Sequence, residues 1–145
     1  MLVIFARDTN ATTFSGMSVY LNGGAGGSSQ TELYGNGSSA SSYRTTTSSP
    51  TFGAPQLYVG RGIPGSTATA NIFAATQVHI LNYKSSTNKT VLTRNAIDLN
   101  GSGFTSLFAS TAYTTSAVTS IELQAVTAFA SGSTAALYGI KASAA

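Results

Sequence analysis

Apolar and polar residues alternate along several short stretches of this chain, which is the pattern of a β-strand that buries one face. The clearest stretches are residues 119–125 (TSIELQA) and 76–82 (TQVHILN), where larger apolar residues stand two positions apart. Further strands are expected at residues 2–7, 18–21, 31–34, 57–59, 90–93 and 135–141. Each strand would place one face against a core and the other toward solvent or a partner.

The segments between these stretches are rich in Gly, Ser, Asn and Pro, which favour turns. About eight short strands separated by turns are typical of an antiparallel β-sandwich or jelly roll. Residues 104–111 fit a single helical turn or a strand equally well, since their two Phe residues stand at helical spacing in a Ser- and Thr-rich context. No long segment carries an apolar stripe at helical spacing, so we expect an all-β, single-domain jelly-roll sandwich over residues 1–145.

Residues 22–55 are richer in Gly, Ser and Thr than the rest of the chain, and we expect them to form a loop-rich region. They include the runs GGAGG at residues 23–27 and TTTSSP at residues 45–50. One interpretation is long, mobile loops between short strands. The other is a set of loops that become ordered only against a neighbouring subunit. From residue 70 onward the strand patterns are regular, and we expect the better-ordered sheet there.

Composition then limits how this fold is stabilised. Ser, Thr and Ala number 21 each and Gly numbers 15, so small residues make up more than half of the chain. Leu, Ile, Val and Phe together lie just above the level of roughly 20 per cent below which chains tend to be disordered. We therefore expect a thin apolar core. The chain has no Cys, which excludes disulfides, thiolate nucleophiles and Cys-ligated metal sites.

Charge excludes further classes of partner. The chain has seven basic and four acidic residues, and no two basic residues are adjacent. Binding to nucleic acid through charge needs a clustered basic patch, so no nucleic-acid partner is expected. The longest apolar run, residues 2–6, is too short for a membrane span or the apolar part of a signal peptide. We therefore expect no membrane partner and see no export signal.

One stretch has the glycine spacing of a nucleotide-binding motif but lacks the sequence context that the motif needs. Gly60, Gly62 and Gly65 have the spacing of the G-x-G-x-x-G loop of dinucleotide-binding proteins. That loop needs a helix after it and an acidic residue about 20 positions further on. Residues 66–73 have no helical pattern, and the next acidic residue is Asp98. We interpret the stretch as a Gly/Pro turn.

Residues that carry acid–base chemistry are few. His79 is the only histidine, and we expect it on the surface or at an interface of its strand rather than in a Ser-His-Asp triad or a metal site. The carboxylates are Asp8, Glu32, Asp98 and Glu122. Glycoside hydrolysis needs two carboxylates about 5–10 Å apart, and the sequence does not forbid such a pair. Sugar clefts usually offer aromatic platforms, however, and the chain has no Trp.

The pattern around two of these carboxylates indicates ordinary structural positions. Glu122 falls on the polar side of its expected strand, and Asp98 precedes an Asn-Gly turn. The chain also has seven Tyr residues, which suit adaptable protein or glycan contacts and are equally common in ordinary strands. We predict no enzymatic activity: no catalytic, cofactor-binding or metal-binding residues, and no cofactor.

Five phrases, in order, resemble a family of tailed-phage virion proteins with jelly-roll domains. They are residues 33–42 (LYGNGSSASS), 63–71 (IPGSTATAN), 79–90 (HILNYKSSTNKT), 119–123 (TSIEL) and 133–141 (STAALYGIK). The family includes capsid cement (decoration) proteins and components of tails and fibres, and the likeness covers most of residues 31–141. It implies a structural β-sandwich protein, usually a homotrimer, without cofactor or catalytic residues.

The resemblance also implies a location and partners. We expect a bacteriophage protein made in the host cytoplasm and carried on the capsid exterior, where it binds the major capsid protein and stabilises the shell. Residues 1–7 and the loops within residues 22–55 would make the subunit and capsid contacts. Relatives often have an extra strand region before the segment that resembles residues 2–7, so we expect the sheet to be completed either by a neighbouring subunit or by the major capsid protein. A second departure is residues 106–110 (SLFAS), which replace an aromatic-rich phrase.

Two other functions stay open from the sequence. A tail-fibre or receptor-binding module that recognises a host-surface glycan is the alternative, although such fibres usually carry a shaft or an anchoring domain as well. A glycan-processing enzyme is supported only by the unpaired carboxylates.

Overall fold

A computed structural model of the chain describes residues 1–24, 27–47 and 56–140. Within these residues the protein is all-β and has no helix, and every strand pairing is antiparallel. The strands are β1 (Leu2–Ala6), β2 (Phe14–Ser15), β3 (Met17–Leu21), β4 (Ser28–Gly35), β5 (Ala40–Thr47), β6 (Leu57–Tyr58), β7 (Ile63–Pro64), β8 (Ala74–Ile80), β9 (Lys89–Asp98), β10 (Gly103–Ala112), β11 (Ile121–Ala125) and β12 (Thr134–Leu137). The expected all-β fold is confirmed.

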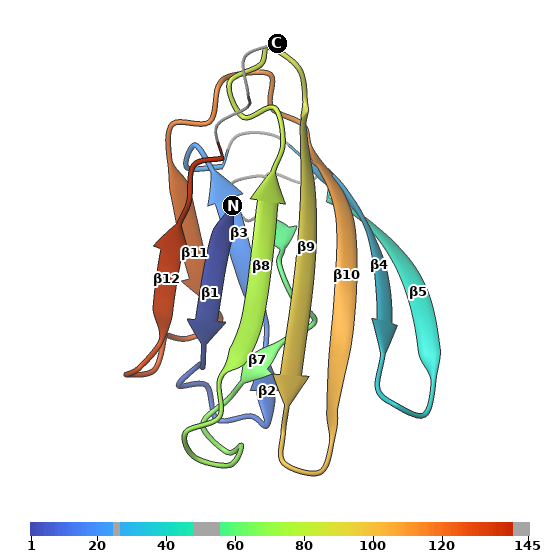
Figure 1. The fold of residues 1–145 in the computed structure, drawn as a ribbon, viewed down its shortest axis with the longest axis vertical. Helices are drawn as coiled ribbons and strands as arrows, with labels where there is room; N and C mark the ends of the chain where they lie inside the picture. The colour runs from blue at the N-terminus through green and yellow to red at the C-terminus, as the bar shows by residue number, and fades with distance from the viewer. Residues whose placement is uncertain (25–26, 48–55, 141–145) are drawn as a thin grey trace.

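The strands form two facing layers (Figure 1). A seven-stranded sheet has the order β12-β1-β8-β9-β10-β4-β5, and a three-stranded sheet has the order β11-β3-β6. A short β2-β7 pair lies at one end. The three-stranded sheet lies behind the β12–β9 half of the large sheet, whereas the β4–β5 hairpin extends beyond it. We call the face of the large sheet that is turned toward the small sheet the inner face, and the opposite one the outer face.

The core lies between the two layers and follows from the alternation in the sequence. Along β9, buried and exposed side chains alternate over all ten residues, which points Val91 and Ile97 inward. They pack in one cluster with residues of the small sheet such as Val19 and Leu57. Fully burying an aliphatic side chain of this size contributes about 1.5–3 kcal/mol, so this half of the sandwich supplies most of the apolar stabilisation.

The inner face also carries buried polar side chains, which are held by hydrogen bonds. Residues 56–62, here called the crossing segment, run between the sheets and receive bonds from side chains of the large sheet. Ser28 Oγ donates to the Gln56 carbonyl at 3.0 Å, and Asn95 Nδ2 donates to the Gly62 carbonyl at 3.3 Å. Because β6 within this segment also pairs with β3, the segment joins the two layers.

One open alternative is decided and one expectation needs correction at the level of elements. Residues 104–111, which fit a helical turn or a strand equally well, lie within strand β10, where long pairings with β9 and β4 outweigh the helical spacing of the Phe residues. The described part of residues 22–55 is mainly the β4–β5 hairpin rather than loops between short strands, because backbone pairing over eight positions orders small polar residues that bury little. Residues 48–55 and residue 141 lie outside the described residues.

Candidate functional site

Residues 60–62 of the glycine-rich stretch connect β6 to β7, Ile63–Pro64 form β7, and Gly65 follows that strand, so the expected turn covers only part of the stretch. No helix follows it in the described chain, so it has no helix N-terminus for a pyrophosphate. Its glycines are needed for close packing instead: a Cβ atom on Gly60 would lie 2.6 Å from the Asn95 side chain, and one on Gly65 would collide with the Thr12 carbonyl oxygen. The stretch has a structural role.

The four carboxylates lie on separate elements. Asp98 ends β9 and accepts a bond from the Asn100 backbone at 2.8 Å, and Glu122 is exposed on β11, as expected for both. Asp8 is fully buried beside the end of β1. Glu32 lies on the inner face of β4 and forms an ion pair with Arg61. In the described part of the chain no three His, Asp or Glu residues come together in a way that could hold a metal ion.

Asp8 is a structural hub. Its carboxylate accepts hydrogen bonds from Ser15 Oγ at 2.6 Å and from the backbone of Asn10 and Ala128 at 3.1 Å each, and of Thr127 at 3.4 Å. Burial alone would raise the pKa of Asp8, but these hydrogen bonds outweigh it and the pKa is lowered. With its oxygens occupied, Asp8 holds three segments together and is not placed for acid–base chemistry.

His79 lies on the outer face of β8 and is partly buried, which fits the expected surface or interface position. Its cross-strand neighbour on β9 is Leu92. Both belong to a face that carries many apolar side chains. That face also holds a broad hollow.

This hollow has a volume of about 970 Å³ and lies across the outer face of the large sheet. One row of neighbouring outer-face residues forms a floor of small side chains: Ala75, Ala96, Thr105, Gly35 and Ala40. Larger apolar side chains stand around the floor and are half exposed, namely Phe5 at 49%, Leu33 at 53% and Leu107 at 41%. The alternation of small and large residues along the sheet therefore produces a concave, apolar surface.

Arg94 is the cation of this hollow. It lies between Gln77 on β8 and Leu107 on β10 in the next cross-strand row. Within the described residues its guanidinium has no hydrogen-bond or ion-pair partner. The lining of the hollow thus combines exposed apolar groups with one positive charge, Arg94, which is a composition found in protein interfaces.

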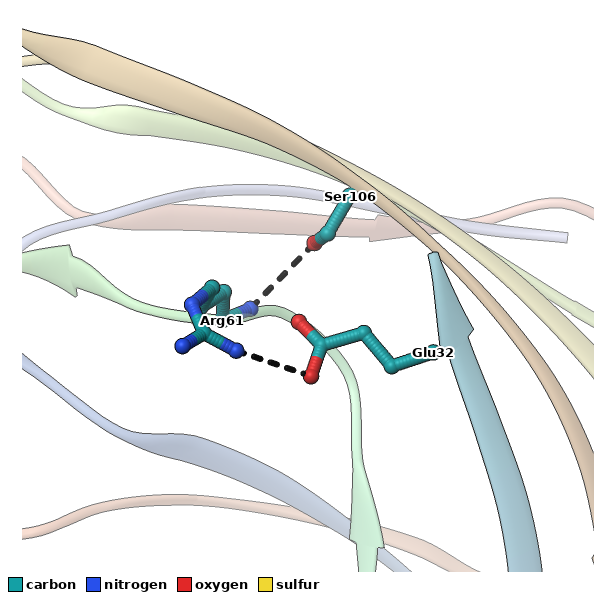
Figure 2. Close-up of polar contacts among 3 residues, drawn as sticks. All are labelled: Glu32, Arg61 and Ser106. Carbon is teal, nitrogen blue, oxygen red and sulfur yellow. Dashed lines mark hydrogen bonds and ion pairs between the residues drawn. The ribbon is translucent and has the colours of Figure 1, made fainter. Parts of the chain in front are cut away.

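Apart from the hollow, a cluster of charged and aromatic side chains lies on the inner face of the β4–β5 hairpin; Figure 2 shows its ion pair. Arg61, from the crossing segment, reaches Glu32 on β4 with an Nη1–Oε2 distance of 3.0 Å, and its backbone N–H donates to Ser106 Oγ at 3.4 Å. The second carboxylate oxygen of Glu32 is buried and has no hydrogen-bond partner among the described residues. The guanidinium also lies 3.6 Å from the ring centroid of Tyr34 and 5.5 Å from that of Tyr43, within range for cation–π attraction.

Tyr34 and Tyr43 form a stacked pair on adjacent strands. Their ring centroids are 5.8 Å apart with an interplanar angle of 15°. A hydrogen bond between the two hydroxyls lowers the pKa of Tyr34 and raises that of Tyr43. Tyr43 is 50% exposed although it points to the inner face, because it lies on β5, one strand beyond the β4 strand that contacts β6 of the small sheet. We call Arg61, Tyr34 and Tyr43 the arginine–tyrosine cluster.

Sequence reasoning missed both of these surfaces. Arg61 stood inside the rejected glycine motif, and Tyr34 was only one of seven scattered tyrosines. Arg94 could have been found from the alternation of β9, which places an arginine on the same side as Leu92. The arginine–tyrosine cluster gave no local signal because its members come from separate segments.

Comparisons with known proteins give no family. No protein-family model matches the chain, and no curated protein and no solved structure matches it significantly. No helix in the described residues is long and apolar enough to cross a membrane.

Proposed function

We propose that this chain is a bacteriophage capsid cement protein, a non-catalytic structural protein that binds the outer surface of the major capsid shell and stabilises it. The jelly-roll class of the sandwich, the homo-oligomer and the location on the virion exterior belong to the same proposal. The resemblance of five ordered sequence phrases is its starting point.

The observation that carries the proposal is the apolar outer face. A single large sheet presents a hollow of about 970 Å³ lined by half-exposed Phe5, Leu33 and Leu107. Contiguous exposed apolar surface of this kind marks an interaction site. Burying it against a partner removes apolar area from water and so favours the assembled state over the free one. A cement protein acts in this way across boundaries between shell subunits.

Arg94 supports a protein surface as the partner. An unpaired guanidinium beside apolar groups gains most when a carboxylate of the partner meets it in a bidentate pair. The surrounding Ser, Thr and Gln side chains suit the wet, hydrogen-bonded rim of such an interface.

The first test counts the copies of this chain in purified particles of the phage that encodes it, by quantitative mass spectrometry. We expect a copy number comparable with that of the major capsid protein. A second arm compares the Leu107→Asp variant with Val126→Asp, which changes a residue that is exposed away from the hollow. Only Leu107→Asp should lose binding to particles. Absence of the chain from particles, or equal binding by both variants, would contradict the proposal.

A second function, recognition of a host-surface glycan by a tail component, is favoured by a different observation. A smaller cleft of about 280 Å³ beside the arginine–tyrosine cluster is lined by Phe14, Tyr58, Glu32 and Arg61. Aromatic rings and charged groups together are suited to stacking on and hydrogen-bonding to a sugar. A low copy number in particles together with glycan binding that is lost in Tyr58→Ala would favour this function over the cement role.

A further inference from the structure

β5 is an open edge of the large sheet. It pairs with β4 on one side and has no strand partner on the other within the described chain. Proteins usually protect such edges with proline, lysine, an inward-pointing charge or a very short strand. β5 is eight residues long, contains no proline or lysine, and carries its one charge, Arg44, on the outer face. The opposite edge, β12, is only four residues long.

The aromatic side chain at this edge is left without a cover. Tyr43 points to the inner face of the β4–β5 hairpin, where it stacks on Tyr34 and lies close to the Arg61 guanidinium. Half of Tyr43 stays exposed. The arginine–tyrosine cluster therefore ends at the sheet edge with an aromatic surface that another strand could cover.

We propose that β5 pairs antiparallel with β5 of a second copy of this chain, so that Tyr43 lies opposite its own counterpart at a twofold axis. The pairing continues the large sheet from one copy into the other and occupies the free backbone groups of both edges. It is independent of the virion role, since it concerns the purified chain alone.

Charge selects this register. Opposed residues in an antiparallel sheet share a face, so a twofold axis perpendicular to the sheet must place one residue opposite itself. Two registers pair most of the strand, one centred on Tyr43 and one centred on Arg44. The Arg44 register sets two guanidinium groups directly against each other, which is unfavourable. The Tyr43 register sets Arg44 opposite Ser42 and brings two aromatic rings together, which is favourable.

Sedimentation equilibrium of the full chain tests the pairing through a matched pair of variants. Tyr43→Lys places like charges at the axis, whereas Tyr83→Lys makes the same change at a similarly exposed tyrosine in the β8–β9 turn. We expect an even number of copies for the wild type, two, or six if the trimer implied by the resemblance also forms. Tyr43→Lys should weaken the association about tenfold or more, and Tyr83→Lys should leave it unchanged.

A crosslinking arm keeps the proposal testable if Tyr43→Lys does not fold. The chain has no Cys, so Tyr43→Cys and Tyr83→Cys each carry a single thiol. Directly opposed side chains have Cβ atoms about 4.5–5.5 Å apart, within reach of a short bis-maleimide. We expect covalent dimers from Tyr43→Cys and none from Tyr83→Cys. A wild type that is monomeric at its highest soluble concentration, an odd number of copies, or equal crosslinking of the two variants would overturn the pairing.

Discussion

The side-chain amide of Gln30 bonds to both backbone groups of Tyr58, accepting from its N–H at 3.1 Å and donating to its carbonyl at 3.0 Å. Gln30 Nε2 also donates to Ser110 Oγ at 2.9 Å. A side chain of the large sheet thus takes the place of a neighbouring strand for the crossing segment. Because the Gln30 amide pairs with the backbone N–H and carbonyl of Tyr58, a polar inner face can lie between the two sheets without leaving these backbone groups unpaired.

Replacing Gln30 with Leu should therefore destabilise the protein by about 2–4 kcal/mol, since it leaves a buried N–H and a buried carbonyl of Tyr58 without partners. Chemical denaturation monitored by circular dichroism measures the change. Gln77→Leu is the control, because Gln77 is exposed on the outer face of β8 and should change the free energy of unfolding by less than about 0.5 kcal/mol. Equal effects of the two changes would contradict the bridging role of Gln30.

Gly60 tests how tightly the crossing segment is packed. A Cβ atom there would lie 2.6 Å from Cγ of Asn95, whose own Nδ2 is bonded to Thr76 Oγ1 at 2.9 Å and so is not free to move away. Gly60→Ala should cost about 1–3 kcal/mol of stability through overpacking. Gly139→Ala is the matched control, since nothing lies within 4 Å of its added Cβ atom. Thermal unfolding of the two variants measures the difference, and a Gly60→Ala protein as stable as the control would show that the segment is loosely packed.

The sequence predicted the elements in which apolar alternation is strong. β8 and β11 lie where the pattern placed them, because their inward positions carry Val, Ile and Leu. β5 was not predicted, because its residues are mostly Ser and Thr on both faces and its order comes from backbone pairing with β4. The arginine–tyrosine cluster could not be predicted for a related reason. Arg61 meets Tyr34 only after the crossing segment has been laid across the sheet, and no local pattern encodes that contact.

Lys89 shows a further dependence of the fold on polar contacts. Its side chain is fully buried at the start of β9, and its ammonium donates to the carbonyls of Ser85, Thr87 and Thr114. Lys89→Met keeps the length of the side chain but leaves these carbonyls without their donor, so we expect a loss of about 2–4 kcal/mol in stability. Lys84→Met, at an exposed position in the same turn, should have little effect. Urea denaturation compares the two, and similar midpoints would contradict a role for the buried ammonium.

Asp8 gives the protein a stability that depends on acid pH. Its pKa in the folded protein is below its ordinary value of 3.8, because the bonds from Ser15 and three backbone N–H groups favour the carboxylate. A lowered pKa means that the unfolded chain binds the proton more readily than the folded one. The stabilisation from Asp8 is therefore complete above a pH of about 5, well above the ordinary value of 3.8, and is lost as the pH falls through 3.8 toward the folded pKa.

The Asp8→Asn variant measures this contribution directly. At neutral pH it should be less stable than the wild type by about 2–4 kcal/mol, because its amide NH₂ faces donors where the carboxylate accepted. Denaturation curves recorded from pH 7 to pH 2 should show the free energies of unfolding of the two proteins converging below pH 3.8. The wild type loses the stabilisation from its ionised carboxylate there, and the variant has no carboxylate to protonate. Asp98→Asn is the control, because Asp98 accepts a single bond in an exposed turn. If the difference in free energy of unfolding between the wild type and Asp8→Asn stayed constant across the acid range, the ionised form of Asp8 would not be the source of the stabilisation.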